Sequence, residues 1–127
     1  MKKTLQILGF FSSLLFFNIS STFAAALVIE VSDNPETKTI AYQCNVGETK
    51  ERVEATYHNA GNISLIDFKW KGDRIIAANV IAASGVKYVG EQYIWWEKNK
   101  EVTLYDLIQD PEEKNPILCK DESLLLF

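Results

Sequence analysis

The sequence has 127 residues and a mass of 14.4 kDa, which is the length of one domain. With 47% apolar and 24% charged residues its composition is that of a globular protein, which excludes a disordered tail, a collagen-like repeat and a coiled coil. The formal charge is −4, and no run of Lys and Arg is longer than two residues, so the basic surface of a nucleic-acid-binding protein is missing. We therefore expect no nucleic-acid partner.

The first residues have the pattern of a secretory signal peptide. Met1–Lys3 gives a positive start, Leu5–Phe17 is mainly apolar, and the small residues Ala24–Ala26 offer cleavage sites. The apolar run is too short and too interrupted to span a bilayer. We expect a signal peptide over residues 1–24, cut somewhere from 24 to 26, followed by a single domain over residues 25–127.

Cleavage would leave an acidic domain without a lipid anchor. It removes two of the 13 basic residues and none of the 17 acidic ones, which takes the formal charge from −4 to −6. The cysteine to which a lipoprotein signal attaches its lipid is missing near Ala24–Ala26. We therefore predict an exported protein with no membrane anchor, which is periplasmic if the source is a Gram-negative bacterium.

The two cysteines, Cys44 and Cys119, are expected to form one disulfide, because an exported chain folds in an oxidising compartment. Only this pairing exists within a monomer. Because it encloses most of the mature chain, the chain-entropy model gives it a stabilisation of about 4 kcal/mol. Two distant cysteines and the single histidine, His58, do not suit a zinc site, so we expect no metal and no cofactor.

From residue 27 onward, short stretches of alternating polarity are separated by turns roughly every ten residues, and none has a convincing helical period. We expect strands at Leu27–Val31, Lys38–Cys44, Glu51–His58, Ile63–Trp70, Arg74–Ala82, Val86–Val89, Gln92–Glu97 and Lys100–Asp106. The pattern predicts an all-β protein, a small antiparallel barrel of about eight strands stapled by the Cys44–Cys119 disulfide. A membrane barrel is not expected, because the alternation fails when counted back from Phe127.

Catalytic patterns are missing from this sequence. It contains neither a G-x-S-x-G nor an H-E-x-x-H motif, and His58 lies among polar residues beside a predicted turn, where a surface histidine is the better interpretation. The acidic stretch with Asp110, Glu112 and Glu113 could hold a cation, but a solvated loop is the better interpretation there too. No residue is therefore expected to be catalytic.

One segment stands out, because it places two polar groups at the same end of the predicted sheet. Ser84 lies in a loop of small residues, Gly90 is near the midpoint, and Lys98 is at the next turn, so hairpin geometry brings the hydroxyl and the ammonium together at one end. On adjacent positions Trp95 and Trp96 point to opposite faces, so one is expected to face outward or toward a rim. On these residues alone, ordinary turn positions remain the simpler interpretation.

The run A-S-G-V-K-Y at residues 83–88, followed by W-W-E-K at residues 95–98, resembles the signature of bacterial inhibitors of chicken-type (c-type) lysozyme. Outside this signature, Tyr42, the turn at Gly47, the hairpin through Asn59 and the late cysteine match the layout of that family. The family has a membrane-bound lipoprotein branch and a periplasmic branch. Without a lipid-bearing cysteine near the cleavage region, the chain resembles the periplasmic branch.

The resemblance implies an eight-stranded antiparallel barrel closed by a disulfide, and a protein that inhibits c-type lysozyme rather than an enzyme. It implies that the serine of the S-G motif and the lysine of the W-x-K motif enter the lysozyme cleft. Here these are Ser84 and Lys98, and Gly85, Lys87 and Tyr88 belong to the same binding segment. The implied partner is c-type lysozyme.

Two residues depart from the family pattern. Asn99 follows Lys98 where the family usually has glycine, but asparagine tolerates the left-handed conformation better than most residues, so we expect the turn to form. Lys87 replaces the more usual arginine, which can make two parallel hydrogen bonds that lysine cannot.

Two other functions stay open at this point. An exported barrel could carry or sense a small apolar ligand, although barrels of this size usually fill their interior with side chains. A glycan-processing enzyme would need a nucleophile with a base or a placed pair of carboxylates, for which the sequence gives no pattern. The oligomeric state is not indicated by the sequence.

Overall fold

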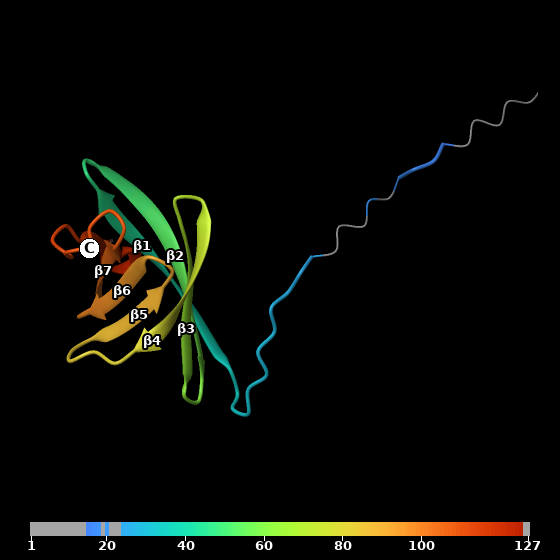
Figure 1. The fold of residues 1–127 in the computed structure, drawn as a ribbon, viewed down its shortest axis with the longest axis horizontal. Coiled ribbons are helices and arrows are strands. Elements are labelled where there is room, and N and C mark those ends of the chain that lie inside the picture. The colour runs from blue at the N-terminus through green and yellow to red at the C-terminus, as the bar shows by residue number, and fades with distance from the viewer. Residues whose placement is uncertain (1–14, 19, 21–23, 126–127) are drawn as a thin grey trace, which may run out of the picture.

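The chain folds into a closed antiparallel β-barrel in the computed structural model, which describes residues 15–18, 20 and 24–125 (Figure 1). The elements are β1 (Glu36–Val46), β2 (Thr49–Ala60), β3 (Ile63–Trp70), β4 (Asp73–Val80), β5 (Val86–Gly90), β6 (Tyr93–Lys98), β7 (Glu101–Asp106), β8 (Ile117–Asp121) and the 3-10 helix η1 (Glu122–Leu124). Each strand pairs with the next one along the chain, and β8 returns to pair with β1. The all-β barrel of about eight strands is thus confirmed.

Most of the expected signal peptide, including both lysines of its positive start, lies outside the described residues. Within the part of the chain that the structure describes, no helix is long and apolar enough to cross a membrane.

The barrel forms because alternate residues of each strand are apolar and so give the strand one apolar face. Val53, Ala55 and Tyr57 of β2 are buried, and Ile66 and Phe68 of β3 continue the inner surface, as the alternation predicts. The interior is filled by side chains, of which the largest fully buried ones are Trp70, Trp95, Tyr42, Phe68, Ile66, Ile75 and Leu104.

Three aromatic side chains are hydrogen-bonded to one another inside this core. The Tyr57 hydroxyl accepts a hydrogen bond from Trp95 Nε1 at 3.2 Å and makes a second one with the Tyr42 hydroxyl at 2.8 Å. Burial raises the pKa of Tyr42 to about 12 and also raises the pKa of Tyr57. Both hydroxyls therefore stay neutral at physiological pH, and the polar atoms of these three side chains are paired. Among the described residues, the buried Trp70 Nε1 is without a hydrogen-bond partner.

The predicted strand at Leu27–Val31 is wrong. These side chains are exposed, with 89% of Leu27 and 78% of Val28 accessible. The barrel closes instead through β8, a strand that the alternation did not reveal, which pairs with β1 over Tyr42–Cys44. Because β8 occupies the position beside β1, an apolar run at Leu27–Val31 does not complete the sheet.

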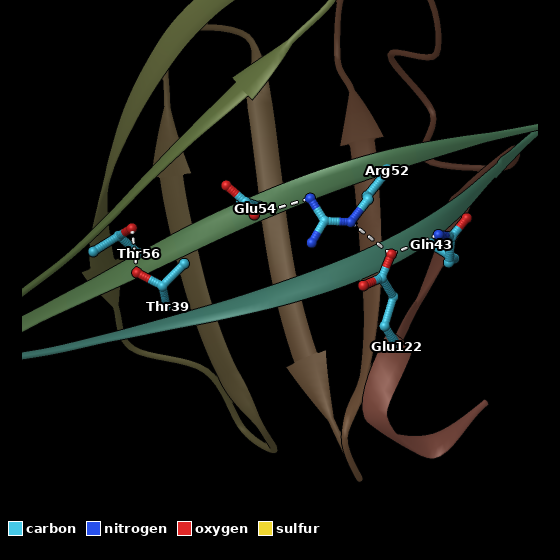
Figure 2. A network of polar contacts seen from close by, with 6 residues as sticks. All are labelled: Thr39, Gln43, Arg52, Glu54, Thr56 and Glu122. Atoms are coloured by element: carbon cyan, nitrogen blue, oxygen red, sulfur yellow. Dashed lines mark hydrogen bonds and ion pairs between the residues drawn. The ribbon is translucent and has the colours of Figure 1, made fainter. Parts of the chain in front are cut away.

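The expected disulfide between Cys44 and Cys119 is confirmed, and it joins β1 to β8 where the barrel closes. A polar network on the outer surface supports the same junction (Figure 2). Arg52 Nε and Gln43 Nε2 both donate to Glu122 Oε1, at 2.7 and 2.6 Å, which ties η1 to β2 and β1. The last described turn of the chain is therefore attached to the barrel wall.

Candidate functional site

Ser84, in the β4–β5 loop, and Lys98, the last residue of β6, lie at the same end of the barrel. Alternate connections of an antiparallel meander share an end, so the β4–β5 loop (residues 81–85) and the β6–β7 turn (residues 99–100) are neighbours. The register of β5 and β6, with Val86 opposite Glu97, brings these two connections side by side. Both Ser84 and Lys98 are exposed, as the hairpin pattern predicts.

Trp96 joins the β4–β5 loop to β6. Its indole Nε1 donates a hydrogen bond to the backbone carbonyl oxygen of Ser84 at 2.9 Å. Trp95, one position earlier, is fully buried in the core, so Trp96 is the member of the pair on the outer surface. The expectation that one of the two tryptophans faces outward is confirmed.

Two lysine ammonium groups lie over the Trp96 ring. Lys98 Nζ is 4.0 Å from the ring centroid and Lys87 Nζ is 4.7 Å from it. Both distances are within the range of a cation–π interaction, which is worth about 0.5–1 kcal/mol at an exposed site. The indole therefore restricts the positions of two positive charges beside the Ser84 loop.

Gly85 lets the loop approach β6 closely. Its φ of +68° lies in the left-handed region, and a Cβ at this position would meet the carbonyl oxygen of Glu97 and lie 2.7 Å from Lys98 Cγ. Any other residue would push the loop away from Lys98. A glycine is thus required by both the backbone conformation and the available space.

The turn after Lys98 forms with asparagine in place of the family glycine. Asn99 and Lys100, the two residues between β6 and β7, have φ values of 51° and 64°. Positive φ at both central positions defines a type I′ hairpin turn, in which asparagine is among the favoured residues. The departure at Asn99 therefore does not prevent the turn that positions Lys98.

Tyr88 differs from the other residues of this segment, because its side chain lies inside the barrel. Only 4% of it is exposed, its ring packs edge-on against Tyr57 with centroids 5.9 Å apart, and its hydroxyl is 3.2 Å from Ser64 Oγ. Tyr88 can influence the loop by supporting β5 from within.

The remaining polar candidates do not join this site. His58 lies on the outer surface with Nε2 3.9 Å from Asp67 Oδ2, and Arg74 also binds that carboxylate. In the β7–β8 loop, Asp110 accepts hydrogen bonds from the backbone N–H groups of Lys114 and Asn115, at 3.0 and 2.8 Å. This Asp organises its own loop, and the described residues contain no group of three or more potential metal ligands.

The arrangement presents fixed hydrogen-bond donors and positive charge at one end of a packed barrel. A serine hydroxyl and lysine ammonium groups are suited to bind the carboxyl groups of a partner. Hairpin geometry predicted Ser84 and Lys98 for this end, and the family resemblance added Gly85, Lys87 and Tyr88, but neither gave a role to Trp96. The adjacent tryptophans were the available signal, and only the hydrogen bond to Ser84 shows which of them organises the loop.

Comparisons with known proteins agree with this description. The family model for the membrane-bound lysozyme-inhibitor of c-type lysozyme matches residues 42–113. Membrane-bound lysozyme inhibitors of C-type lysozyme from Cupriavidus necator and Pseudomonas aeruginosa are similar, the first with 35% identity over 75 residues and the second with 34% identity over 87 residues. These alignments cover 59% and 68% of this chain. They cover 58% of the first relative and 66% of the second, so the chain spans less than two thirds of the length of either relative.

A solved structure is also similar. The crystal structure of Pseudomonas aeruginosa MliC in complex with hen egg white lysozyme matches with a TM-score of 0.64 and 30% identity, covering 78% of this chain and 96% of the MliC chain. The fold and these matches place the chain in a class of small, disulfide-closed β-barrels named as protein inhibitors of an enzyme, not in an enzyme class. The family model covers more than half of the sequence. The chain belongs to the family of membrane-bound lysozyme inhibitors of c-type lysozyme.

Proposed function

We propose that this protein inhibits c-type lysozyme by inserting Ser84 and Lys98 into the active-site cleft. The observation that carries the proposal is their shared position at one exposed end of a barrel that resembles an MliC solved in complex with hen egg white lysozyme. Gly85 and Lys87 belong to the same binding surface, and Tyr88 supports it from inside the barrel.

The chemistry of the target explains the choice of residues. Lysozyme uses one carboxylic acid that is held protonated and one ionised carboxylate. The Lys98 ammonium would form a charge-assisted hydrogen bond with one carboxyl group, and the Ser84 hydroxyl would form a neutral hydrogen bond with the other. With both carboxyl groups engaged and the cleft filled, substrate could neither enter nor be protonated.

Charge supports the same proposal at longer range. The chain has a formal charge of −4, or −6 after the expected cleavage, whereas c-type lysozymes are strongly basic. Opposite net charges accelerate encounter and make its rate depend on ionic strength. The two partners would therefore attract one another, while the contact itself would be made by the lysine ammonium and the serine hydroxyl.

The packed interior favours inhibition over the transport of a small apolar ligand. Trp95, Trp70 and Phe68 fill the space in which a barrel of this size would hold such a ligand. No specific observation favours the ligand-carrying alternative.

We further propose that the protein is exported to the periplasm without a lipid. The relatives are named membrane-bound, but both cysteines of this sequence, Cys44 and Cys119, are joined in the disulfide and are not available to carry a lipid. Cell fractionation with metabolic labelling by a fatty acid tests this. We expect the unlabelled protein in the periplasmic fraction, and a lipid-labelled protein in the membrane fraction would contradict the proposal.

Competition with a substrate oligosaccharide tests cleft insertion directly. We expect a chitin oligosaccharide to raise the apparent dissociation constant of the complex between this protein and c-type lysozyme. The Lys98→Ala variant should bind weakly, and Lys69→Ala, which removes an exposed lysine from β3, should bind like the parent. Binding that the oligosaccharide does not affect would contradict insertion into the cleft.

A further inference from the structure

We infer that Trp96 is a positioning residue, which holds Ser84 and Lys98 in their binding arrangement before a partner arrives. The inference rests on the proposed function, because it concerns the same end of the barrel. It adds a residue that has no contact of its own with the lysozyme carboxyl groups in the proposed mechanism. Trp96 acts through the residues on either side of it.

The first contact fixes the loop. Trp96 Nε1 donates to the Ser84 carbonyl oxygen at 2.9 Å, across a sequence separation of 12 residues. The loop of residues 81–85 lies outside the strand pairing of β4 and β5, so this hydrogen bond supplies a restraint that the sheet does not. It fixes the backbone at the residue whose hydroxyl is proposed to bind.

The second contact fixes the charge. Lys98 Nζ lies 4.0 Å from the centroid of the Trp96 ring, although Lys98 itself is exposed. A lysine side chain in water samples many rotamers, and ordering them on binding weakens affinity. A lysine already held on an indole loses less of this freedom, so the complex forms more tightly.

Gly85 and Lys87 complete the arrangement around the indole. A Cβ on Gly85 would lie 3.2 Å from Trp96 Nε1 and 2.7 Å from Lys98 Cγ, so the loop, the indole and the lysine are in mutual contact. Lys87 Nζ, 4.7 Å from the ring centroid, adds a second positive charge over the same ring. A single outward-facing side chain thus contacts both the β4–β5 loop, at Ser84, and the end of β6, at Lys98.

NMR of the protein alone tests whether Trp96 holds Lys98. In the parent, the Lys98 Hε protons should be shifted upfield by the indole ring current. Trp96→Leu should return them to random-coil positions, and Trp96→Phe should keep part of the shift. Tyr105→Leu is the matched control, because Tyr105 is another half-buried, outward-facing aromatic residue, located on β7 and paired with Ile94 rather than with the loop. Unshifted Lys98 protons in the parent would overturn the inference.

Binding to c-type lysozyme tests whether the restraint of Ser84 and Lys98 by Trp96 contributes to affinity. Losing the hydrogen bond to the Ser84 carbonyl oxygen and the cation–π contact with Lys98 should weaken binding by Trp96→Leu roughly ten-fold. Trp96→Phe should lie between Trp96→Leu and the parent, and Tyr105→Leu should equal the parent. Near-ultraviolet circular dichroism and thermal unfolding of each variant establish that the barrel is retained.

A double-mutant cycle separates positioning from loss of structure. If Trp96 acts through Lys98, Lys98→Ala should cost less affinity in the Trp96→Leu background than in the parent. Fully additive losses, or a Trp96→Leu variant that binds like the parent, would overturn the inference while leaving the proposed function intact. A parent that does not bind lysozyme would overturn the proposed function instead, and the Lys98 ring-current shift would then decide the inference alone.

Discussion

Cys44 and Cys119 are register partners at the junction of the first and last strands, with Cα atoms 4.0 Å apart and a disulfide between them. Their junction is short, because β8 pairs with β1 only over Tyr42–Cys44. The bond therefore stabilises the closure of the barrel at one of its two shortest strand pairings, the other being that of β4 with β5.

Reduction of this disulfide should destabilise the protein strongly. Because the bond spans 75 residues, the chain-entropy model gives a loss of about 4 kcal/mol in the free energy of unfolding. Denaturant titration of the oxidised protein, the reduced protein and the Cys44→Ala/Cys119→Ala variant measures this loss. Equal midpoints for the oxidised and reduced proteins would show that strand pairing alone closes the barrel.

The buried tyrosine pair should make the barrel sensitive to high pH. Burial raises the pKa of Tyr42 from 10.0 to about 12, and it raises the pKa of Tyr57 too, so the unfolded chain loses these protons first as the pH rises. The stability that depends on neutral hydroxyls is fully present below about pH 10 and is lost as the pH rises toward about 12.

Denaturant titration at a series of alkaline pH values measures this loss, with tyrosinate absorbance recorded alongside. We expect the absorbance of Tyr42 and Tyr57 to appear only as the barrel unfolds. Ionisation of all five tyrosines near pH 10 in a folded barrel would contradict the account.

Lys98→Ala should weaken inhibition of c-type lysozyme more than Ser84→Ala. Removing the ammonium leaves a desolvated lysozyme carboxylate unpaired, at a cost of roughly 2–5 kcal/mol in binding free energy, whereas a neutral hydrogen bond contributes about 0.5–1.5 kcal/mol. Inhibition constants for both variants and for the control Lys69→Ala measure the difference. A greater loss for Ser84→Ala would reverse the roles that we assign to the two residues.

Gly85→Ala should reduce both stability and inhibition. The left-handed φ of +68° costs an alanine roughly 1–2 kcal/mol, and the added Cβ also displaces the loop from Lys98. Gly47→Ala is the matched control, because its φ is +60° but no described atom beyond its two chain neighbours lies within 4 Å of an added Cβ. The control should lose stability without losing inhibition. Equal inhibition by both variants would show that close approach of the loop is not required.

Asn99→Gly should leave inhibition unchanged, whereas Asn99→Val should lower stability by about 1–2 kcal/mol, because a β-branched residue is strained at a φ of 51°. Asn45→Val, at an exposed position in β1, controls for the change in side chain. Thermal unfolding and inhibition of the three variants measure these effects. A stable Asn99→Val variant would contradict the type I′ turn.

The sequence predicted the barrel because its alternation is local and regular. Val53 and Tyr57, for example, reveal the inner face of their strand without any knowledge of its neighbours. Pairing at the closure is not local, so the pattern favoured the apolar run Leu27–Val31 and missed Ile117–Asp121, a strand of five residues that follows a proline-rich loop. Which of two candidate strands completes a barrel depends on contacts distant in the sequence.

The candidate site was also predictable only in part, because some of its contacts join residues that are distant in the sequence. Hairpin geometry places Ser84 and Lys98 at one end, whereas the roles that we propose for them against lysozyme come from the family signature and not from spacing. The hydrogen bond from Trp96 to the Ser84 carbonyl oxygen joins β6 to the β4–β5 loop across 12 residues, so only the three-dimensional structure reveals it. The sequence analysis also did not predict that the Tyr88 side chain lies in the core.

Lysis of a lysozyme-sensitive cell-wall suspension by c-type lysozyme, measured by turbidity with increasing amounts of the oxidised protein, tests the central claim most directly. We predict stoichiometric inhibition by the parent that weakens with added salt, and much weaker inhibition by Lys98→Ala. Unchanged lysis at micromolar excess of the oxidised parent would contradict the proposal that this barrel is an inhibitor of c-type lysozyme.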